Sequence, residues 1–320
     1  MLTAYLAAGG HLRAAAAAPE AVWFDLESPT PEETALVARE TGLPLPSQAN
    51  LSEIETSSRL SVTGDTLTLS LPTVSRQETI LHPTVTGFVL SPTRLVTLRF
   101  APSPLFAQFT AAPRPLGDSP AAQLLTELME AIVDRQADSL EALRAELDAL
   151  SRRIFHHGTD HHPAAQRRTA ERELQAALGT LGRGYDSLSV LRDSQLGVAR
   201  LVPYVLANAP WLPAPLQARL ASVAKDVASL NEFSTHLTDK VQFLQDATLG
   251  LINIAQNTLI KVLTIVSIMG IPPTLIAGIY GMNFHIIPEL SWTYGYAYAW
   301  GLMILSAVAP LAWFRKKGWI

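Results

Sequence analysis

The feature that most constrains this chain is a pair of long uncharged apolar stretches at its carboxyl-terminal end. Val262 to Phe284 is a run of roughly 23 residues and Leu290 to Phe314 is a run of roughly 25, and each is long enough to cross a bilayer as a helix. The link between them is too short to form a domain. The sequence therefore predicts a helical hairpin through a membrane. A buried core hairpin of a soluble protein is the disfavoured alternative, because runs this long are rare in soluble cores.

Basic residues predict the orientation of this hairpin. The tail Arg315–Lys317 follows the second stretch and Lys261 precedes the first, whereas the short link contains no Lys or Arg. By the positive-inside rule we expect a multi-pass protein of the cell (inner) membrane with both termini in the cytoplasm. Aromatic residues gather at the outer start of the second stretch, as an interfacial belt would, at Trp292, Tyr294, Tyr296, Tyr298 and Trp300.

The composition agrees with a membrane protein and excludes several other classes. Charged residues make up 16% of the chain, against about a quarter in soluble domains. The absence of cysteine excludes disulfides, thiolate metal sites and cysteine catalysis. A formal net charge of −4 argues against a nucleic-acid partner. The sequence has no phosphate-binding loop and no hydrolase motif, so we expect no nucleotide binding, no enzymatic activity and no organic cofactor.

Residues 1–115 are expected to form a cytoplasmic α/β domain. Ala21 to Leu26 is a short apolar strand, and Thr30 to Glu33 is a capping box that opens a helix. Gly64-Asp65 and Ser91 to Thr93 each lie between two apolar segments, which predicts two hairpins. The boundary of this domain is marked by prolines at positions 102, 104, 113 and 115.

Residues 116–257 are expected to form long cytoplasmic helices. Apolar residues at three- and four-residue spacing make a coiled-coil-like seam in the first helix, at Leu140, Leu143, Leu147, Leu150 and Ile154. This helix is expected to end at Phe155 to Gly158. The segment His156 to His162 holds four histidines and is able to bind metal by composition. In a solvated turn, weak binding without a function is the favoured interpretation.

Two further helices are predicted. One runs from about Pro163 to Leu206 and is ended by a group of prolines that begins at Pro203. The next begins near Leu216 and has no proline before Pro272, so it should run without a break into the first membrane span. A helix of that length, about 80 Å or more, would connect the cytoplasmic part to the membrane as a stalk.

One face of the first span carries small polar and apolar side chains in a repeat of three and four residues. Its members are Asn257, Ile260, Leu263, Ser267, Ile271, Thr274 and Gly278. Packing between helices, with serine and threonine as weak polar contacts, would explain this face. A pore lining would explain it as well. That interpretation requires oligomerisation, because two spans per chain cannot enclose a pore.

The residues at the end of this span carry a family resemblance. Gly281-Met282-Asn283 follows a proline-containing span, and Ile287 to Leu290 and a basic tail come after it. This arrangement resembles the CorA family of divalent-cation channels. The match covers most of the chain and includes Gln256 to Thr264, Pro272 to Thr274, Tyr280 to Phe284, Asp226-Val227, Asp239-Lys240, Phe243-Leu244 and Ile54 to Arg59.

The resemblance implies an α+β membrane protein that forms a homopentameric funnel in the lipid bilayer. Each chain would contribute the cytoplasmic α/β domain, the long stalk helices and two carboxyl-terminal spans. The membrane part would comprise a pore-lining first span (258–284), an outer loop (285–291), a second span (292–314) and a basic cytoplasmic tail (315–320).

The resemblance also implies roles for single residues. Gly281, Met282 and Asn283 would form the outer selectivity filter, with Gly281 and Asn283 binding the hydrated ion. The face from Asn257 to Gly278 would line the path inward. In the family, cytoplasmic acidic residues bind Mg²⁺ between subunits and hold the pore shut, and Asp226 is the best candidate here for such a ligand.

The chemistry of the residues fits this cargo. Mg²⁺ gives up its water shell reluctantly, and amide and carbonyl oxygens from Asn283 and Gly281, repeated around an axis, would recognise the hydrated ion. The first span contains no Asp, Glu, His or Cys, the groups that a dehydrating Zn²⁺ site would use. Glu289 in the outer loop would raise the local cation concentration.

We therefore expect a passive influx channel for Mg²⁺, driven by the membrane potential and closed by intracellular Mg²⁺. Co²⁺ and Ni²⁺ are expected as further cargo. Two alternatives stay open. A zinc transporter of the ZntB type would share the architecture, and a membrane-anchored sensor without ion flux would share the two spans and the short outer loop.

Overall fold

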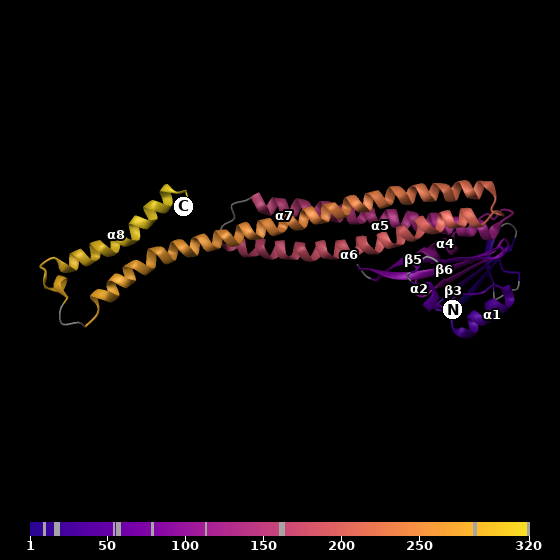
Figure 1. Ribbon diagram of the computed structural model, residues 1–320, viewed down its shortest axis with the longest axis horizontal. Coiled ribbons are helices and arrows are strands. Elements are labelled where there is room, and N and C mark those ends of the chain that lie inside the picture. Colours follow the sequence, from indigo (N-terminus) through magenta and orange to yellow (C-terminus); the bar gives the residue numbers. More distant parts are fainter. Residues whose placement is uncertain are drawn as a thin grey trace. The chain divides into compact units, whose positions relative to one another are not determined.

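The computed structural model describes residues 1–8, 11–15, 20–53, 55, 59–77, 80–112, 114–159, 164–283 and 287–318 (Figure 1). The chain divides into two units. The first, here the core unit, consists of Met1–Thr159 and Gln175–Gln245. The second, here the apolar unit, consists of Asp160–Leu174 and Asp246–Ile320.

A seven-stranded mixed sheet forms one part of the core unit. Its spatial order is β2-β1-β3-β7-β6-β5-β4. Strands β3 and β7 pair in parallel, and every other pair is antiparallel. The strands are β1 (Leu2–Ala8), β2 (His11–Ala15), β3 (Trp23–Glu27), β4 (Leu60–Thr63), β5 (Thr66–Gln77), β6 (Ile80–Leu90) and β7 (Leu95–Arg99).

The two predicted hairpins are confirmed. β4 and β5 are joined by Gly64-Asp65, where Gly64 has φ +60, and β6 and β7 are joined by the loop after Leu90. Two findings go beyond the prediction. Strands β5 and β6 form a longer hairpin with each other, and β1 and β2 add an antiparallel pair beside β3. The residue pairs formed by β1 include alanines, which have a low intrinsic preference for strands.

Helices cover both faces of the sheet. They are α1 (Pro31–Thr41), α2 (Gln48–Ser52), α4 (Pro104–Ala111), α5 (Pro120–Thr159), α6 (Ala164–Asn208) and α7 (Ala214–Tyr280). The capping box of α1 is confirmed. The Thr30 hydroxyl accepts from Glu33 N–H at 3.2 Å, and the Glu33 carboxylate accepts from Thr30 N–H at 3.0 Å. Gly42 caps the other end in the left-handed region at φ +70.

Alternation along the strands separates two apolar clusters. On one face Trp23, Phe88 and Leu95 pack against α4, α5, α6 and the first part of α7. On the other face their neighbours Phe24, Val89 and Val96 pack against α1 and α2. Successive side chains of a strand point to opposite faces, so this two-residue period assigns each face its partner.

A buried polar group lies between β3 and β7. Arg99 donates from Nη2 to Asp25 Oδ2 at 2.8 Å and lies 2.9 Å from the Glu27 carboxylate. Thr97 donates to Asp25 Oδ1 at 2.7 Å and accepts from the indole N–H of Trp23 at 3.0 Å. The parallel register places Asp25 beside Thr97, and therefore these groups satisfy one another inside the core.

Helices α5, α6 and the first part of α7 run side by side in the core unit (Figure 1). The predicted seam is confirmed, because all five of its residues are buried. Polar contacts tie the helices together: Gln136 donates to Ser194 at 2.8 Å, Ser234 donates to Gln195 at 3.0 Å, and Lys240 pairs with Asp148.

The prediction that Pro203 would break the second helix is wrong. Pro203 lies inside α6, which continues to Asn208. The neighbours Leu201, Val202 and Val205 are buried in the main apolar cluster. Their packing against the sheet and the other helices outweighs the one backbone donor that the proline removes.

The apolar unit contains the last part of α7, the 3-10 helix η1 (Pro288–Ser291) and α8 (Gly295–Lys316), and the chain reverses direction between α7 and α8 (Figure 1). The apolar window of α7 is 0% buried and that of α8 is 11% buried. Among the described residues these helices are thus exposed rather than enclosed, which suits membrane spans and not a soluble core hairpin. Phe284 to Ile286 lie outside the described residues.

Candidate ion-binding site and pore-lining face

The Gly281-Met282-Asn283 motif forms the exposed carboxyl-terminal end of α7. Gly281 N–H donates to Ala277 O at 2.9 Å and Met282 N–H donates to Ile279 O at 3.3 Å, so the chain keeps one tightened turn after Tyr280. All three motif residues are exposed. The last carbonyls of a helix lack helical donors and carry its negative partial charge. This end therefore offers a cation neutral oxygens in a favourable potential.

Gly281 fits tightly into this turn. A Cβ atom added there would lie 3.0 Å from the Ala277 carbonyl oxygen and 3.6 Å from that of Gly278. A side chain would crowd the same backbone oxygens that end the helix. The absence of a side chain keeps the carbonyl groups near Asn283 accessible.

The predicted pore-lining face is exposed along α7. Of its seven members Ser267 is half-buried, and Asn257, Ile260, Leu263, Ile271, Thr274 and Gly278 are exposed. The outer half of this face forms a groove of about 620 Å³. The groove adds residues that sequence reasoning did not name, and it is lined by Val266, Ser267, Gly270, Ile271, Thr274, Leu275, Gly278, Ile279 and Met282.

Two features of this part of α7 concern oxygen atoms. Thr274 donates its hydroxyl proton to Gly270 O at 2.7 Å, so the remaining capacity of that hydroxyl is as an acceptor. Pro272 and Pro273 lie inside the helix and have no N–H to donate. The carbonyls one turn earlier, of Ile268 and Met269, therefore lack their usual helical partners. Backbone and side-chain oxygens are thus available midway along an apolar helix.

Glu289 lies in η1, immediately before α8. Its carbonyl accepts from Trp292 N–H at 3.3 Å. A Cβ atom at Gly295 would lie 2.1 Å from that same carbonyl, so only glycine permits this close approach of η1 to the start of α8. The rings of Trp292 and Tyr298 are tilted against each other, with 5.7 Å between their centroids. The predicted aromatic group at this end is exposed.

Asp226, the regulatory candidate, lies on α7 close to an acidic row on α5. Partial burial and then the nearby carboxylates of Glu130, Asp138 and Asp226 raise the pKa of Asp134. In the part of the chain that the structure describes, no three His, Asp or Glu side chains are placed to hold a metal ion.

The remaining motif residues are only partly visible. The side chains of His156 to His162 lie outside the described residues, as do Ile54 and Thr56 to Ser58 of the amino-terminal segment. Arg59, at the end of that segment, is half-buried.

Comparison with known proteins identifies the family. Residues 19–316 match the family model described as "CorA-like Mg2+ transporter protein". The chain belongs to the CorA family. It is 33% identical over 303 residues to the magnesium transport protein CorA of Haemophilus influenzae. The aligned region covers 94% of this chain and 92% of that protein. It is also 33% identical over 305 residues to the protein of the same name from Escherichia coli K12, with the same coverage.

Solved structures confirm the fold. The complete CorA magnesium transporter of Methanocaldococcus jannaschii superposes with a TM-score of 0.72 at 21% identity, over 100% of this chain and 99% of that one. The full-length CmaX protein gives a TM-score of 0.58 at 21% identity. The amino-terminal α/β part, the long helix and the two candidate carboxyl-terminal spans of this chain therefore make a CorA fold.

Proposed function

We propose that this CorA-family protein conducts Mg²⁺ into the cell through a pore lined by α7. The observation that carries the proposal is the position of the Gly-Met-Asn motif. It caps the exposed end of a long apolar helix whose polar face is also exposed. Neutral oxygens at a helix carboxyl terminus attract a cation without stripping its water, which is how a strongly hydrated ion can pass.

The driving force is electrical. A divalent cation that moves inward gains about 4.6 kcal/mol per 100 mV of inside-negative potential. No nucleotide motif is present in the sequence, and none is needed for a passive flux of this kind. The protein would lie in the inner membrane with both termini in the cytoplasm, because the basic residues flank the cytoplasmic ends of the spans.

The pore requires several copies, and we propose a homopentamer. Face residues such as Ile260, Leu263 and Ile271 are exposed in the single chain. Around a shared axis the same residues would form apolar rings that close the path by excluding water. Asn283 and Gly281 would form the outer filter, Glu289 would concentrate cations in front of it, and Co²⁺ and Ni²⁺ would follow the same route.

Zn²⁺ is the second candidate cargo. The proposal favours Mg²⁺ because the described filter and face offer amide, hydroxyl and carbonyl oxygens, whereas zinc sites in proteins are built mainly from His, Cys and carboxylate ligands. The relatives at 33% identity are named magnesium transport proteins, and this name supports the same cargo here.

Ion flux into proteoliposomes tests the proposal. Mg²⁺ or Zn²⁺ is supplied outside at a set inside-negative potential, and wild type is compared with Asn283→Ala. We expect potential-driven Mg²⁺ entry that falls to the background of empty vesicles in the variant, while the oligomer survives on size exclusion. Asn231→Ala, on the same helix but in the core unit, is the matched control and should conduct normally.

Each other result has a definite meaning. Unchanged flux in Asn283→Ala would remove this residue from the filter. Zn²⁺ entry without Mg²⁺ entry would establish the zinc transporter. A wild-type protein that passes neither ion would support the sensor without flux.

Closure by intracellular Mg²⁺ is a separate part of the proposal. Asp226 and the carboxylates around Asp134 repel one another, and a bound Mg²⁺ between subunits would relieve that repulsion. High Mg²⁺ should therefore protect the core unit from limited proteolysis in wild type and protect it less in Asp226→Asn. Equal protection of both proteins would exclude Asp226 as a ligand.

A further inference from the structure

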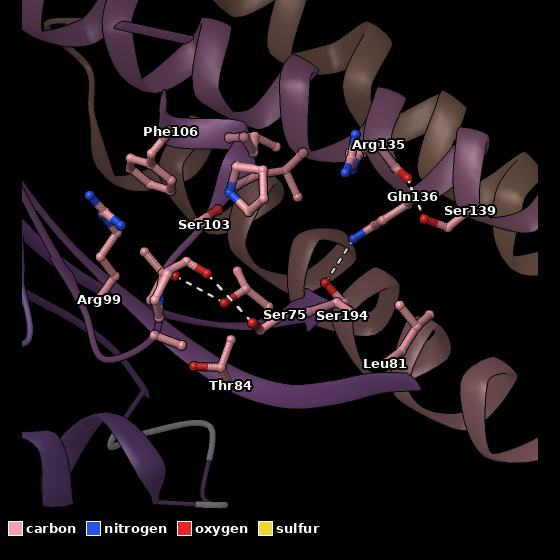
Figure 2. A pocket seen from close by; sticks show the side chains of 18 of the residues that line it. Ser75, Leu81, Thr84, Arg99, Ser103, Phe106, Arg135, Gln136, Ser139 and Ser194 are labelled. Atoms are coloured by element: carbon pink, nitrogen blue, oxygen red, sulfur yellow. Dashed lines mark hydrogen bonds between the residues drawn. The ribbon is translucent and has the colours of Figure 1, made fainter. Parts of the chain in front are cut away.

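A small cavity in the core unit lies where β5 and β6 meet α4, α5 and α6 (Figure 2). Its volume is about 70 Å³. A water molecule needs roughly 10–15 Å³ of such space, so the cavity has room for about five water-sized atoms. A tetrahedral oxyanion such as phosphate has that number of non-hydrogen atoms. The cavity lies far from the filter in sequence and plays no part in the transport proposal.

Most of the cavity surface is apolar, but several hydrogen-bond donors lie along it. Ser103 precedes α4 but makes no side-chain cap, and the first backbone bond of that helix runs from Ala107 N–H to Ser103 O at 3.3 Å. The N–H groups of Leu105 and Phe106, both lining residues, are therefore without a partner in the helix. Such a helix start favours anions. Ser194 accepts from Gln136 at 2.8 Å, and its own O–H stays available to a ligand.

The charge in the cavity has the matching sign. Among the described lining residues there is no Asp or Glu, and two arginines are present. Arg99 is held by Asp25 and Glu27. Arg135 forms no ion pair with any described residue, and Figure 2 shows it on α5 directly before Gln136. Arg135 is exposed, and it is thus a lining cation without an ion-pair partner among the described residues.

A buried amide atom supplies an independent indication of a ligand. Gln136 is 3% exposed and lines the cavity, and its Oε1 is buried without a hydrogen-bond partner. A buried carbonyl oxygen left unpaired is costly. A hydrogen-bond donor in the cavity, such as a water molecule or a ligand hydroxyl, would satisfy it. A hydrogen phosphate offers both features at once, because it has oxygens for the donors and one O–H for Gln136.

We propose that this cavity binds a small hydroxyl-bearing oxyanion of the size of hydrogen phosphate. Arg135, Ser103, Ser194 and the start of α4 bind its oxygens, and Gln136 accepts its O–H. The bound anion connects α4, α5 and α6, and it therefore stabilises the core unit. This is a ligand site of the soluble part and is independent of which cation the protein transports.

Calorimetric titration of the full-length protein in detergent tests the site, with Mg²⁺ removed by chelation. Inorganic phosphate is the probe, and sulfate and chloride are compared at equal ionic strength. Saturable phosphate binding is expected. Arg135→Gln should weaken it by about tenfold or more, since hydrogen bonds to charged groups contribute about 1.5–3 kcal/mol. Arg152→Gln, an exposed arginine elsewhere on α5, is the control and should bind normally.

Gln136→Leu tests the recognition of the ligand hydroxyl. Wild type should prefer phosphate over sulfate by roughly two- to tenfold, the value of one neutral hydrogen bond, and the variant should lose that preference. Phosphate should also raise the thermal unfolding temperature of wild type above that of Arg135→Gln.

Three outcomes would overturn the proposal. The first is the absence of saturable phosphate binding by folded wild type. The second is equal binding by Arg135→Gln and Arg152→Gln. The third is equal stabilisation by chloride, which would reduce the effect to ionic strength. None of these outcomes depends on ion flux, so the site can fail while the transport proposal stands.

Discussion

Leu140 and Leu263 belong to similar sequence patterns but differ in burial. Each belongs to an apolar row at helical spacing, but Leu140 is 0% exposed in the core unit and Leu263 is 67% exposed in the apolar unit. The difference shows that apolar periodicity alone does not say what a helix packs against. In the core unit the partner is the same chain. In the apolar unit we propose that it is lipid or further copies of the chain.

Polar groups differ between the units in the same way. In the core unit some hydroxyls bond to carbonyls one turn earlier, such as Thr126 to Ala122, and other polar groups form contacts between distant segments, such as Arg99 with Asp25. In the apolar unit the threonines Thr258, Thr264 and Thr274 bond to carbonyls one turn earlier in their own helix. Such bonds satisfy a hydroxyl without any tertiary partner, which suits a helix whose neighbours are not in the same chain.

A large effect is expected on the buried ion pair of the core unit. Asp25→Ala leaves Glu27 as the remaining carboxylate partner of Arg99 and removes the acceptor of Thr97, and we expect the free energy of unfolding to fall by about 3 kcal/mol. Urea unfolding of the detergent-solubilised full chain, followed by circular dichroism, measures this. Glu141→Ala, at an exposed site on α5, should change stability by about 0.5 kcal/mol or less. Similar values for both variants would contradict the assigned role of Asp25.

The paired leucines test the comparison directly. Leu140→Ala opens a cavity in the seam and should cost about 2–5 kcal/mol of unfolding free energy. Leu263→Ala removes an exposed side chain, and we expect a change of about 0.5 kcal/mol or less in the same assay. Its effect should instead be on ion flux, because the apolar ring at that position becomes wider. A large loss of core-unit stability in Leu263→Ala would erase the distinction between the two units.

Glu289→Gln should have a smaller effect on transport. Glu289 is half-buried, and a charge near the protein surface contributes up to about 1 kcal/mol, so the half-saturating Mg²⁺ concentration should rise by about fivefold at most while maximal flux is kept. Flux measured over a range of Mg²⁺ concentrations separates the two quantities. Complete loss of transport would place Glu289 in the filter itself.

Replacing Asp134 should give a small gain in stability. Its pKa is raised by partial burial and by neighbouring carboxylates, including Glu130 and Asp138 one helical turn away. Folding therefore favours the protonated form, and the contribution of Asp134 is lost as the pH rises through its folded pKa. Asp134→Asn should raise stability at neutral pH by about 0.2–0.5 kcal/mol for each like-charged pair removed. Unfolding at neutral and acidic pH checks this, and no gain at neutral pH would contradict the repulsion.

Replacing Asp148, on the same helix, should change the pH dependence of stability in the opposite direction. The hydrogen bond from Lys240 is the main cause that lowers the pKa of Asp148. Its contribution is present above the unfolded pKa and is lost as the pH falls from about 4 through the folded pKa. Asp148→Asn should remove this acid-side loss. The two variants should therefore change the pH dependence of unfolding in opposite directions.

Local signals in the sequence predicted much of this structure. The two long apolar helices, the capping box at Thr30, the turn at Gly64-Asp65 and the buried seam follow from short-range patterns, and the structure confirms them. The strands β1 and β2 could not be predicted in this way. Alanine-rich segments have a weak strand preference, and the pairing of β1 with β3 stabilises them.

Some features of the candidate site were likewise predictable from local sequence, and others were not. The position of Gly281 to Asn283 between two spans was readable from sequence, and so was the face that includes Thr274. The tightened turn over Ala277, the release of carbonyls by Pro272 and Pro273 and the groove at Met282 required coordinates. Likewise, no sequence pattern joins Gln136 to Ser194 or Asp226 to Asp134, because those pairs lie on different helices.

The sequence by itself determined which two helices are long and apolar enough to span a membrane and which motif lies at the end of the first. Those properties depend on runs of neighbouring residues, whose hydrophobicity and spacing act locally. Tertiary structure alone decided which side chains meet across the sheet and between α5, α6 and α7. Such contacts join residues far apart in the chain, and only the packing of whole elements selects them.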